Sequence, residues 1–177
     1  DEHTSRGLGD VYKRQSHTIS DIDLTFDLHD TATIVTAVSQ VKQLKDDTRL
    51  QLEGESLKLI SVSVNGEAWT RFEEKEGALE ISALPEAFEL KIVTEINPEE
   101  NTALEGLYKS GGAFCTQCEA EGFRRITYYM DRPDVLAKYT TKVIADKAAY
   151  PFLLSNGNRI AEGLSLIHIS EPTRRVF

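Results

Sequence analysis

Apolar and polar residues alternate along the first half of the chain. In residues 21–28, the apolar side chains Ile22, Leu24, Phe26 and Leu28 are separated by polar ones. A period of two places every second side chain on the same face, so this pattern predicts a β-strand with one buried face. Similar segments, several of them rich in β-branched residues, predict further strands over residues 32–41, 50–52, 57–64, 68–70, 79–81 and 88–96.

Turn signals separate these strands. Asn65 and Gly66 lie between two alternating segments, and a two-residue hairpin turn needs the positive φ that these residue types tolerate. In the second half, residues 133–140 predict one short helix with a proline near its start, and residues 141–145 and 152–154 predict more strands. About seven strands before Pro98 favour an all-β fold. We predict an antiparallel or mixed β-sheet sandwich with one short helix.

The two ends of the chain are expected to differ in origin from its middle. Codons can be chosen for residues 5–15 whose reverse complement encodes residues 164–174 without a mismatch. Natural segments have no reason to be opposite strands of one duplex, and the sequence resembles a translated transposase end and adapter from a sequencing library. We therefore expect residues 1–15 and 164–177 to be non-native tails around a natural domain, residues 16–163, that lacks its last strands.

This assignment has structural consequences. We expect residues 1–15 to pack little against the core. Residues 164–169 are expected to form a strand, because the natural chain would continue there.

The charge balance restricts the possible partners. The chain has 177 residues and a net charge of −9, and residues 16–163 contain 15 basic against 25 acidic residues. An acidic chain repels phosphate backbones, so we expect no nucleic-acid partner. No apolar run approaches the ~18 residues that a membrane helix needs, so we expect no membrane partner. The length suits one domain with its own core.

Residues 113–124 (A-F-C-T-Q-C-E-A-E-G-F-R) carry the densest chemistry in the chain. Cys115 and Cys118 form a C-x-x-C motif, which raises the alternative of a thiol oxidoreductase or a zinc site. A redox cysteine needs cations or a helix N-terminus nearby, whereas Glu119 and Glu121 follow here, and a structural zinc site needs four ligands. We therefore predict two buried, reduced thiols, no metal site in this chain, and a cytoplasmic location.

Gln117 and Glu119 are the candidate binding residues. If this segment is extended, both side chains emerge on one face. An amide beside a carboxylate suits a ligand that has a cation next to a carbonyl, such as the α-ammonium group and first residue of a peptide. The alternative is that Glu119 is a solvent-exposed acid without a binding role, and residue chemistry alone favours this alternative.

Three blocks of sequence carry a resemblance to a known family. In order, the chain contains L-E-G-L-Y, T-Q-C-E-A-E-G-F-R and Y-Y-M-D-R-P-D, and with them it resembles the N-terminal domain of the bacterial aminopeptidase N family of gluzincin zinc exopeptidases. The resemblance implies a β-rich, saddle-shaped domain that leans on a thermolysin-like catalytic domain of the same polypeptide. It also implies that Glu119 holds the α-ammonium group of a peptide substrate and that Gln117 lies beside the first side-chain pocket.

The family's catalytic motifs are absent from this sequence. No histidine of the chain begins an H-E-x-x-H motif, and no G-A-M-E-N segment occurs. We therefore expect no catalytic residue and no cofactor in this chain, with zinc bound by the catalytic domain of the parent enzyme. The fragment alone should be inactive. A free-standing β-sandwich binding module remains the alternative, and it would need a self-contained pocket within residues 16–163.

Overall fold

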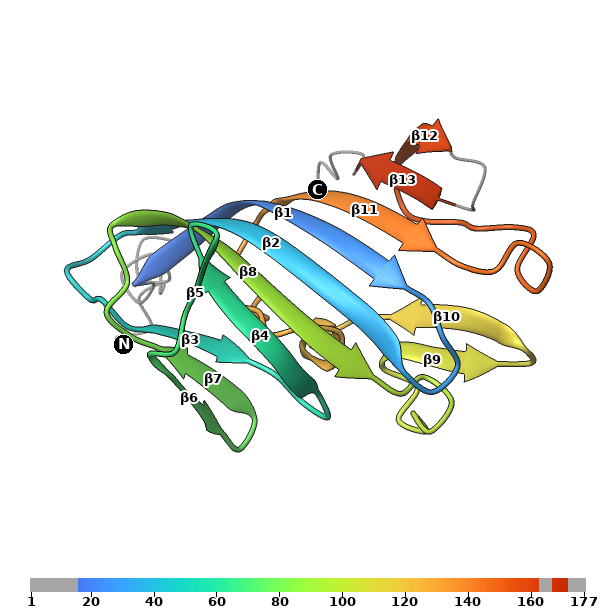
Figure 1. Cartoon of the computed structure of the whole chain (residues 1–177), viewed down its shortest axis with the longest axis horizontal. Coiled ribbons are helices and arrows are strands. Elements are labelled where there is room, and N and C mark those ends of the chain that lie inside the picture. Colours follow the sequence, from blue (N-terminus) through green and yellow to red (C-terminus); the bar gives the residue numbers. More distant parts are fainter. Residues whose placement is uncertain (1–15, 163–166, 172–177) are drawn as a thin grey trace, which may run out of the picture.

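β-strands dominate the part of the chain that the structure describes. The computed structural model describes residues 16–162 and 167–171 (Figure 1). Within these residues, eight strands form one sheet in the order β12-β13-β11-β1-β2-β8-β4-β5. Their bounds are β1 His17–Asp27, β2 Thr33–Gln43, β4 Lys58–Val64, β5 Glu67–Ala68, β8 Ala87–Ile96, β11 Lys138–Ile144, β12 Asn158–Glu162 and β13 Ile167–Glu171.

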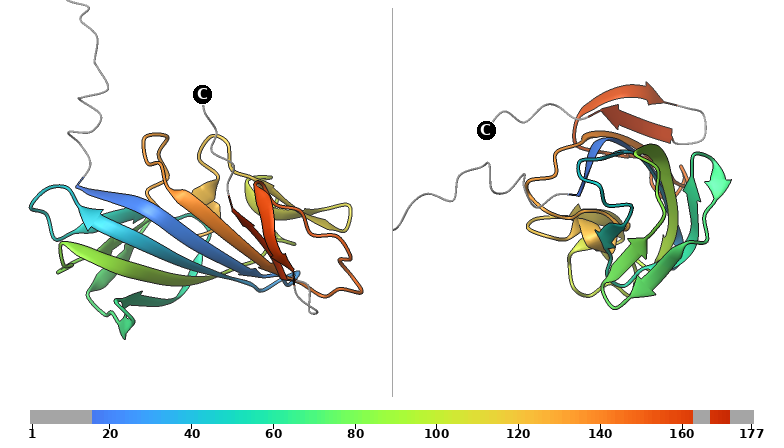
Figure 2. Two further views of the ribbon diagram at one scale, coloured as in Figure 1. Left: turned by 90° about the horizontal axis from the view of Figure 1, so that it is seen from above. Right: turned by 90° about the vertical axis from the view of Figure 1, so that its left-hand side faces the viewer.

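Two small sheets complete the described fold. One has the order β3-β7-β6 and the other pairs β10 with β9. Their strands are β3 Leu50–Glu53, β6 Phe72–Lys75, β7 Ala78–Ile81, β9 Gly106–Ser110 and β10 Ala113–Gln117, and the 3-10 helix η1 spans Phe123–Arg125. Figure 2 shows that the large sheet is strongly curved and that the small sheets and η1 lie on its concave side. The predicted all-β sandwich of antiparallel and mixed sheets is therefore confirmed.

The core lies between the large sheet and the small ones. Strand β8 alternates buried and exposed residues along its whole length, as the sequence pattern predicted. The large sheet contributes Ile22 and Ile92, whereas β3 and β7 contribute Leu50, Leu79 and Ile81, all at most 2% exposed. Burial of these apolar faces against each other is the main stabilising contribution to such a fold.

The Asn65-Gly66 turn is confirmed. The two residues have φ angles of 51° and 81° and connect β4 to its antiparallel partner β5. Both residue types tolerate this backbone conformation, which explains why they mark the turn in the sequence.

The short helix predicted over residues 133–140 is wrong. Arg132 forms a two-nitrogen ion pair with Asp134 at 3.0 and 2.8 Å, and the backbone N–H of Val135 donates to the carbonyl of Arg132 in a single turn. Strand β11 then begins at Lys138 and pairs in parallel with β1. The β-branched residues of β11 favour this strand, and pairing with β1 outweighs the weak helical signal of a segment too short to be stable alone.

The C-terminal part of the described chain also differs from expectation. Residues 152–154 are not a strand, and Phe152 and Leu154 are exposed. The strand expected over residues 164–169 is seen in its described part as β13, Ile167–Glu171, which pairs with β11 and β12, whereas residues 164–166 lie outside the described residues. The expectation for residues 1–15 falls outside the described residues. Among residues 16–162 and 167–171, no helix is long and apolar enough to cross a membrane.

Candidate functional site

The β9–β10 hairpin leads directly into the candidate site. Gly111 and Gly112, at φ 58° and 84°, form its turn, and β10 runs back along β9 until Gln117 lies opposite Gly106. The strand ends there, so the extended segment that was expected to include Glu119 stops two residues early. A shared strand face therefore does not explain how Gln117 and Glu119 are placed.

A tight loop, residues 118–122, places Glu119 instead. The backbone N–H of Gly122 donates to the carbonyl of Cys118 at 3.0 Å, which folds the loop back on itself. The amide Nε2 of Gln117 donates to the backbone carbonyl of Glu119 at 3.4 Å. Gln117 and Glu119 are thus neighbours, and both side chains are exposed to solvent.

The two carboxylates of this loop have different surroundings. Glu121 forms an ion pair with Nη2 of Arg124 at 3.1 Å. Within the described residues, no hydrogen bond or ion pair engages the carboxylate of Glu119, whose backbone carbonyl alone has a partner. A carboxylate without an internal cation can accept hydrogen bonds from an external one.

Arg124 is held in turn by Asp131, and neither residue was singled out from the sequence. Oδ2 of Asp131 accepts from the backbone N–H of Arg124 at 3.0 Å and from its Nε at 3.1 Å, and the Asp131 carbonyl accepts from Nη2 at 3.1 Å. The Asp131 side chain is 11% exposed. Both residues belong to the sequence blocks that carry the family resemblance, but a contact between elements leaves no local signal in the sequence.

The two cysteines are free thiols and are half-buried rather than fully buried. Burial raises the pKa of Cys118 to about 11, and the negative charge of Asp131 adds to the effect. A thiol with such a pKa stays protonated at neutral pH, which is the opposite of what a redox cysteine requires.

The described side chains offer no cluster of metal ligands. In residues 16–161, whose side chains the structure describes, no three His, Cys, Asp or Glu side chains are grouped as a metal ion would need. A zinc ion therefore does not fit the described residues, since protein zinc sites use three or four such ligands.

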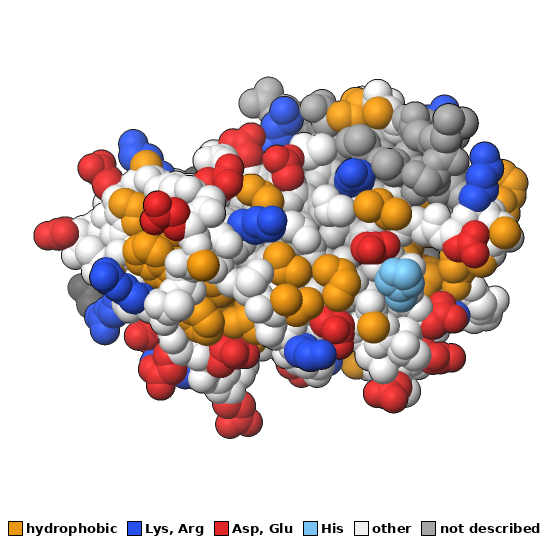
Figure 3. Space-filling view, viewed as in Figure 1, with side chains coloured by type: hydrophobic (Ala, Val, Ile, Leu, Met, Phe, Trp, Pro, Cys, Tyr) orange, Lys and Arg blue, Asp and Glu red, His pale blue; other side chains and the backbone are white. Residues whose placement is uncertain are grey.

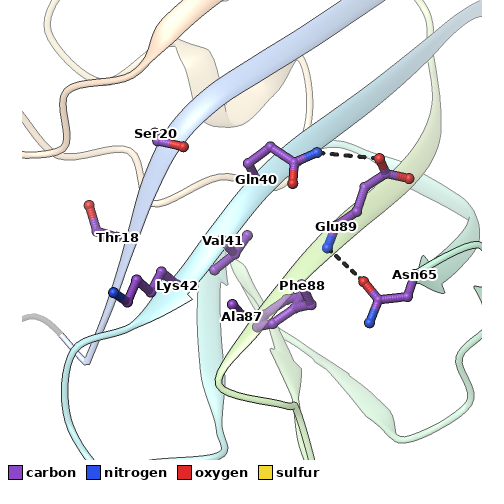
Figure 4. A pocket seen from close by; sticks show the side chains of 9 residues that line it. All are labelled: Thr18, Ser20, Gln40, Val41, Lys42, Asn65, Ala87, Phe88 and Glu89. Atoms are coloured by element: carbon purple, nitrogen blue, oxygen red, sulfur yellow. Dashed lines mark hydrogen bonds between the residues drawn. The ribbon is translucent and has the colours of Figure 1, made fainter.

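A shallow cavity of about 500 Å³ lies elsewhere, over the β1, β2 and β8 part of the large sheet. Figure 4 shows two hydrogen bonds among its lining residues: Gln40 donates to the carboxylate of Glu89 at 3.3 Å, and Asn65 accepts from the Glu89 backbone N–H at 2.9 Å. Neither Gln117 nor Glu119 lines this cavity. Three of its polar residues are thus engaged with one another, which gives little support to a self-contained binding module.

Comparisons with known proteins agree with the resemblance in the sequence. The family described as Peptidase M1 N-terminal domain matches residues 13–165. Aminopeptidase N of Escherichia coli is 65% identical over 153 residues, which cover 86% of this chain and 18% of that protein. Aminopeptidase N of Haemophilus influenzae is 49% identical over 156 residues, with the same coverage of each chain.

Solved structures show the same fold. The crystal structure of Legionella pneumophila aminopeptidase A in complex with aspartic acid superposes with a TM-score of 0.83 at 31% identity, covering 94% of this chain and 21% of that one. A variant M1 zinc metallopeptidase from Deinococcus radiodurans, bound to a Tyr-Ser-Ala substrate, gives a TM-score of 0.74 at 16% identity over 91% of this chain and 40% of that one.

The chain thus spans about a fifth of the length of the relatives it matches in sequence. The family match nevertheless covers most of the chain itself, and the large curved sheet with its two small sheets is the fold that these structures share. The membership that the three sequence blocks predicted is confirmed: this chain belongs to the Peptidase M1 N-terminal domain family.

Proposed function

We propose that this chain is part of the N-terminal domain of a zinc-dependent aminopeptidase, a hydrolase that releases N-terminal amino acids from peptides. The 65% identity to an aminopeptidase N and the family match over residues 13–165 support this proposal. The family boundaries lie within three residues of 16 and 163, which also supports a natural domain between two non-native tails.

In this function, Glu119 binds the α-ammonium group of the substrate and Gln117 lies beside the pocket for its first side chain. The observation that carries the proposal is the contrast within the loop: Arg124 engages Glu121, whereas the exposed carboxylate of Glu119 has no partner in the part of the chain that the structure describes. An ammonium group would donate charge-assisted hydrogen bonds to this carboxylate. Such a contact selects a free amino terminus over an internal peptide bond, as an exopeptidase requires.

The remaining parts of the active site would come from the catalytic domain of the same polypeptide, which would also hold the zinc ion. Three strongly exposed apolar side chains near the C-terminal end of the described chain support such a partner: Leu136, Phe152 and Leu154 are 81, 86 and 92% exposed. Covering these side chains with a surface of the catalytic domain would remove them from water, which is favourable.

The parent enzyme would act in the cytoplasm on peptides. Two free thiols suit a reducing compartment.

The net charge of −9 and the mixture of acidic and basic side chains on the face seen in Figure 3 disfavour a nucleic-acid partner.

A chimeric enzyme tests the proposal. Residues 16–163 replace the corresponding segment of the 65% identical Escherichia coli aminopeptidase N, and KM and kcat are measured with an amino-acid p-nitroanilide. We expect Glu119→Gln to raise KM by about tenfold or more, because a hydrogen bond between charged groups is lost. The matched control Glu121→Gln, in the same loop and paired with Arg124, should change KM by less than about twofold, since an exposed ion pair contributes little. Equal effects of the two variants would refute the role of Glu119.

A further inference from the structure

The loop that carries Glu119 is fixed at both ends. At its start, β10 pairs with β9 through Gln117 opposite Gly106. At its end, the backbone N–H and the side chain of Arg124 are both bonded to Asp131. Six residues, 118–123, therefore connect two anchored points, and the position of Glu119 depends on both of them.

Asp131 connects the loop to the rest of the domain. Its own N–H donates to the carboxylate of Glu53 in β3 at 3.1 Å. Glu53 also exchanges two backbone hydrogen bonds with Tyr129, at 2.8 and 3.0 Å. The Arg124 side chain is thus bonded to Asp131, which is itself bonded to the three-stranded sheet. Moving Arg124 therefore requires breaking its hydrogen bonds to Asp131.

The Arg124 guanidinium also places a positive charge beside the loop, where it binds Asp131 and Glu121. Its Nη2 atom lies 3.1 Å from the Asp131 carbonyl and 3.1 Å from Oε2 of Glu121, and its Nε is bonded to Oδ2 of Asp131. These contacts commit the guanidinium to two acidic residues other than Glu119. Without the Asp131 carboxylate, this half-buried cation would lose its hydrogen bond at Nε and could turn toward Glu119, where it would compete with a substrate ammonium group.

We infer that Arg124 and Asp131 form a positioning pair for Glu119: they fix the loop and keep the Arg124 guanidinium bonded to other acidic residues. This inference rests on the proposed function. It assigns the pair no contact with substrate, because the pair acts through the loop. Its loss should therefore weaken substrate binding and leave the chemical step unaffected.

A double-mutant cycle in the chimeric enzyme tests the pair. Asp131→Asn keeps the size of the side chain but removes its charge. We expect it to raise KM by about fivefold or more and to change kcat by less than about twofold. In the Glu119→Gln background, the same substitution should change KM by less than about twofold, because its effect passes through Glu119.

The control and the alternative variant keep the outcomes distinct. Arg132→Gln removes the nearby exposed Arg132–Asp134 ion pair and should leave KM unchanged. If Asp131→Asn does not yield folded enzyme, Arg124→Lys, which keeps the charge and loses the two-nitrogen geometry, enters the same cycle and is judged by the same criterion.

Each result bears on one claim. An equal increase in KM in both backgrounds, or no increase in either, overturns the positioning pair. If Glu119→Gln itself leaves KM unchanged, both the proposed role of Glu119 and the positioning pair are wrong. If Glu119→Gln raises KM and the cycle shows no coupling, only the inference fails.

Discussion

At the scale of single residues, Glu119 and Glu121 are chemically identical and two positions apart, yet their surroundings separate them. Glu121 has a cation at 3.1 Å, and Glu119 has none among the described residues. Arg124 is the cause, because its bonds to Asp131 leave it directed at Glu121. The neighbouring arginine therefore decides which carboxylate remains available to a ligand.

Cys118 gives a residue-scale prediction that also tests the oxidoreductase alternative. With a pKa of about 11, roughly one Cys118 thiol in a thousand is ionised at pH 8. Alkylation by iodoacetamide requires the thiolate, so its rate at Cys118 should rise about tenfold per pH unit between pH 8 and 10. Mass spectrometry of a Cys115→Ser variant measures this rate. A plateau below about pH 9 would show an activated thiol and contradict the assignment.

The sequence identified the two proposed ligand-binding residues but not the reason for their placement. Gln117 and Glu119 were expected on one strand face, whereas β10 ends at Gln117 and a turn follows. Arg124 and Asp131 were missed because their contact is tertiary and has no periodic pattern. Residue type and family resemblance can indicate a candidate, but the charge that surrounds it depends on the fold.

At the scale of elements, Gly122 determines how closely the loop approaches the hairpin. Its φ of −83° suits any residue. A Cβ atom at this position would, however, lie 2.6 Å from the carbonyl oxygen of Gln117 and 3.2 Å from the backbone nitrogen of Gly106. Both are backbone atoms, so they cannot rotate away as a side chain could.

We therefore predict that Gly122→Ala destabilises the domain by about 1–3 kcal/mol, the range for overpacking, and also raises KM in the chimera. The control is Gly77→Ala, where φ is +73° and no atom lies within 4 Å of the added Cβ. Backbone strain there should cost about 1–2 kcal/mol, without any change in KM. Urea unfolding of the domain and kinetics of the chimera measure the two effects. If the variants change KM equally, the loop is not held by this close approach.

The strands were predictable to the extent that their pattern was local. Strands β1, β2 and β8 and the Asn65-Gly66 turn followed from alternation and turn chemistry. The helix over residues 133–140 was wrong, and the parallel pairing of β11 with β1 was not foreseen. Those partners lie more than a hundred residues apart in the chain, and no local pattern specifies such a contact.

At the scale of the whole molecule, the curved sheet is a support and the candidate site lies at its margin. The core is buried between the large and small sheets, whereas Gln117, at the end of β10, and Glu119, in the loop that follows, are exposed. A loop held by a rigid scaffold is a common place for binding residues. Since the site is open to solvent on this chain, enclosing a substrate requires a second surface.

The last prediction concerns the activity of the chain alone. The sequence contains no H-E-x-x-H motif, and the described residues group no three side chains of the kind that bind zinc. Binding the amino end of a peptide does not by itself weaken the next peptide bond, because catalysis requires groups that stabilise the transition state. The purified chain with added zinc should therefore hydrolyse an amino-acid p-nitroanilide no faster than zinc in buffer, while the chimera assayed in parallel turns it over. Zinc-dependent turnover that increases in proportion to the concentration of this chain would show that residues within it perform the chemistry, and the division of roles proposed here would be wrong.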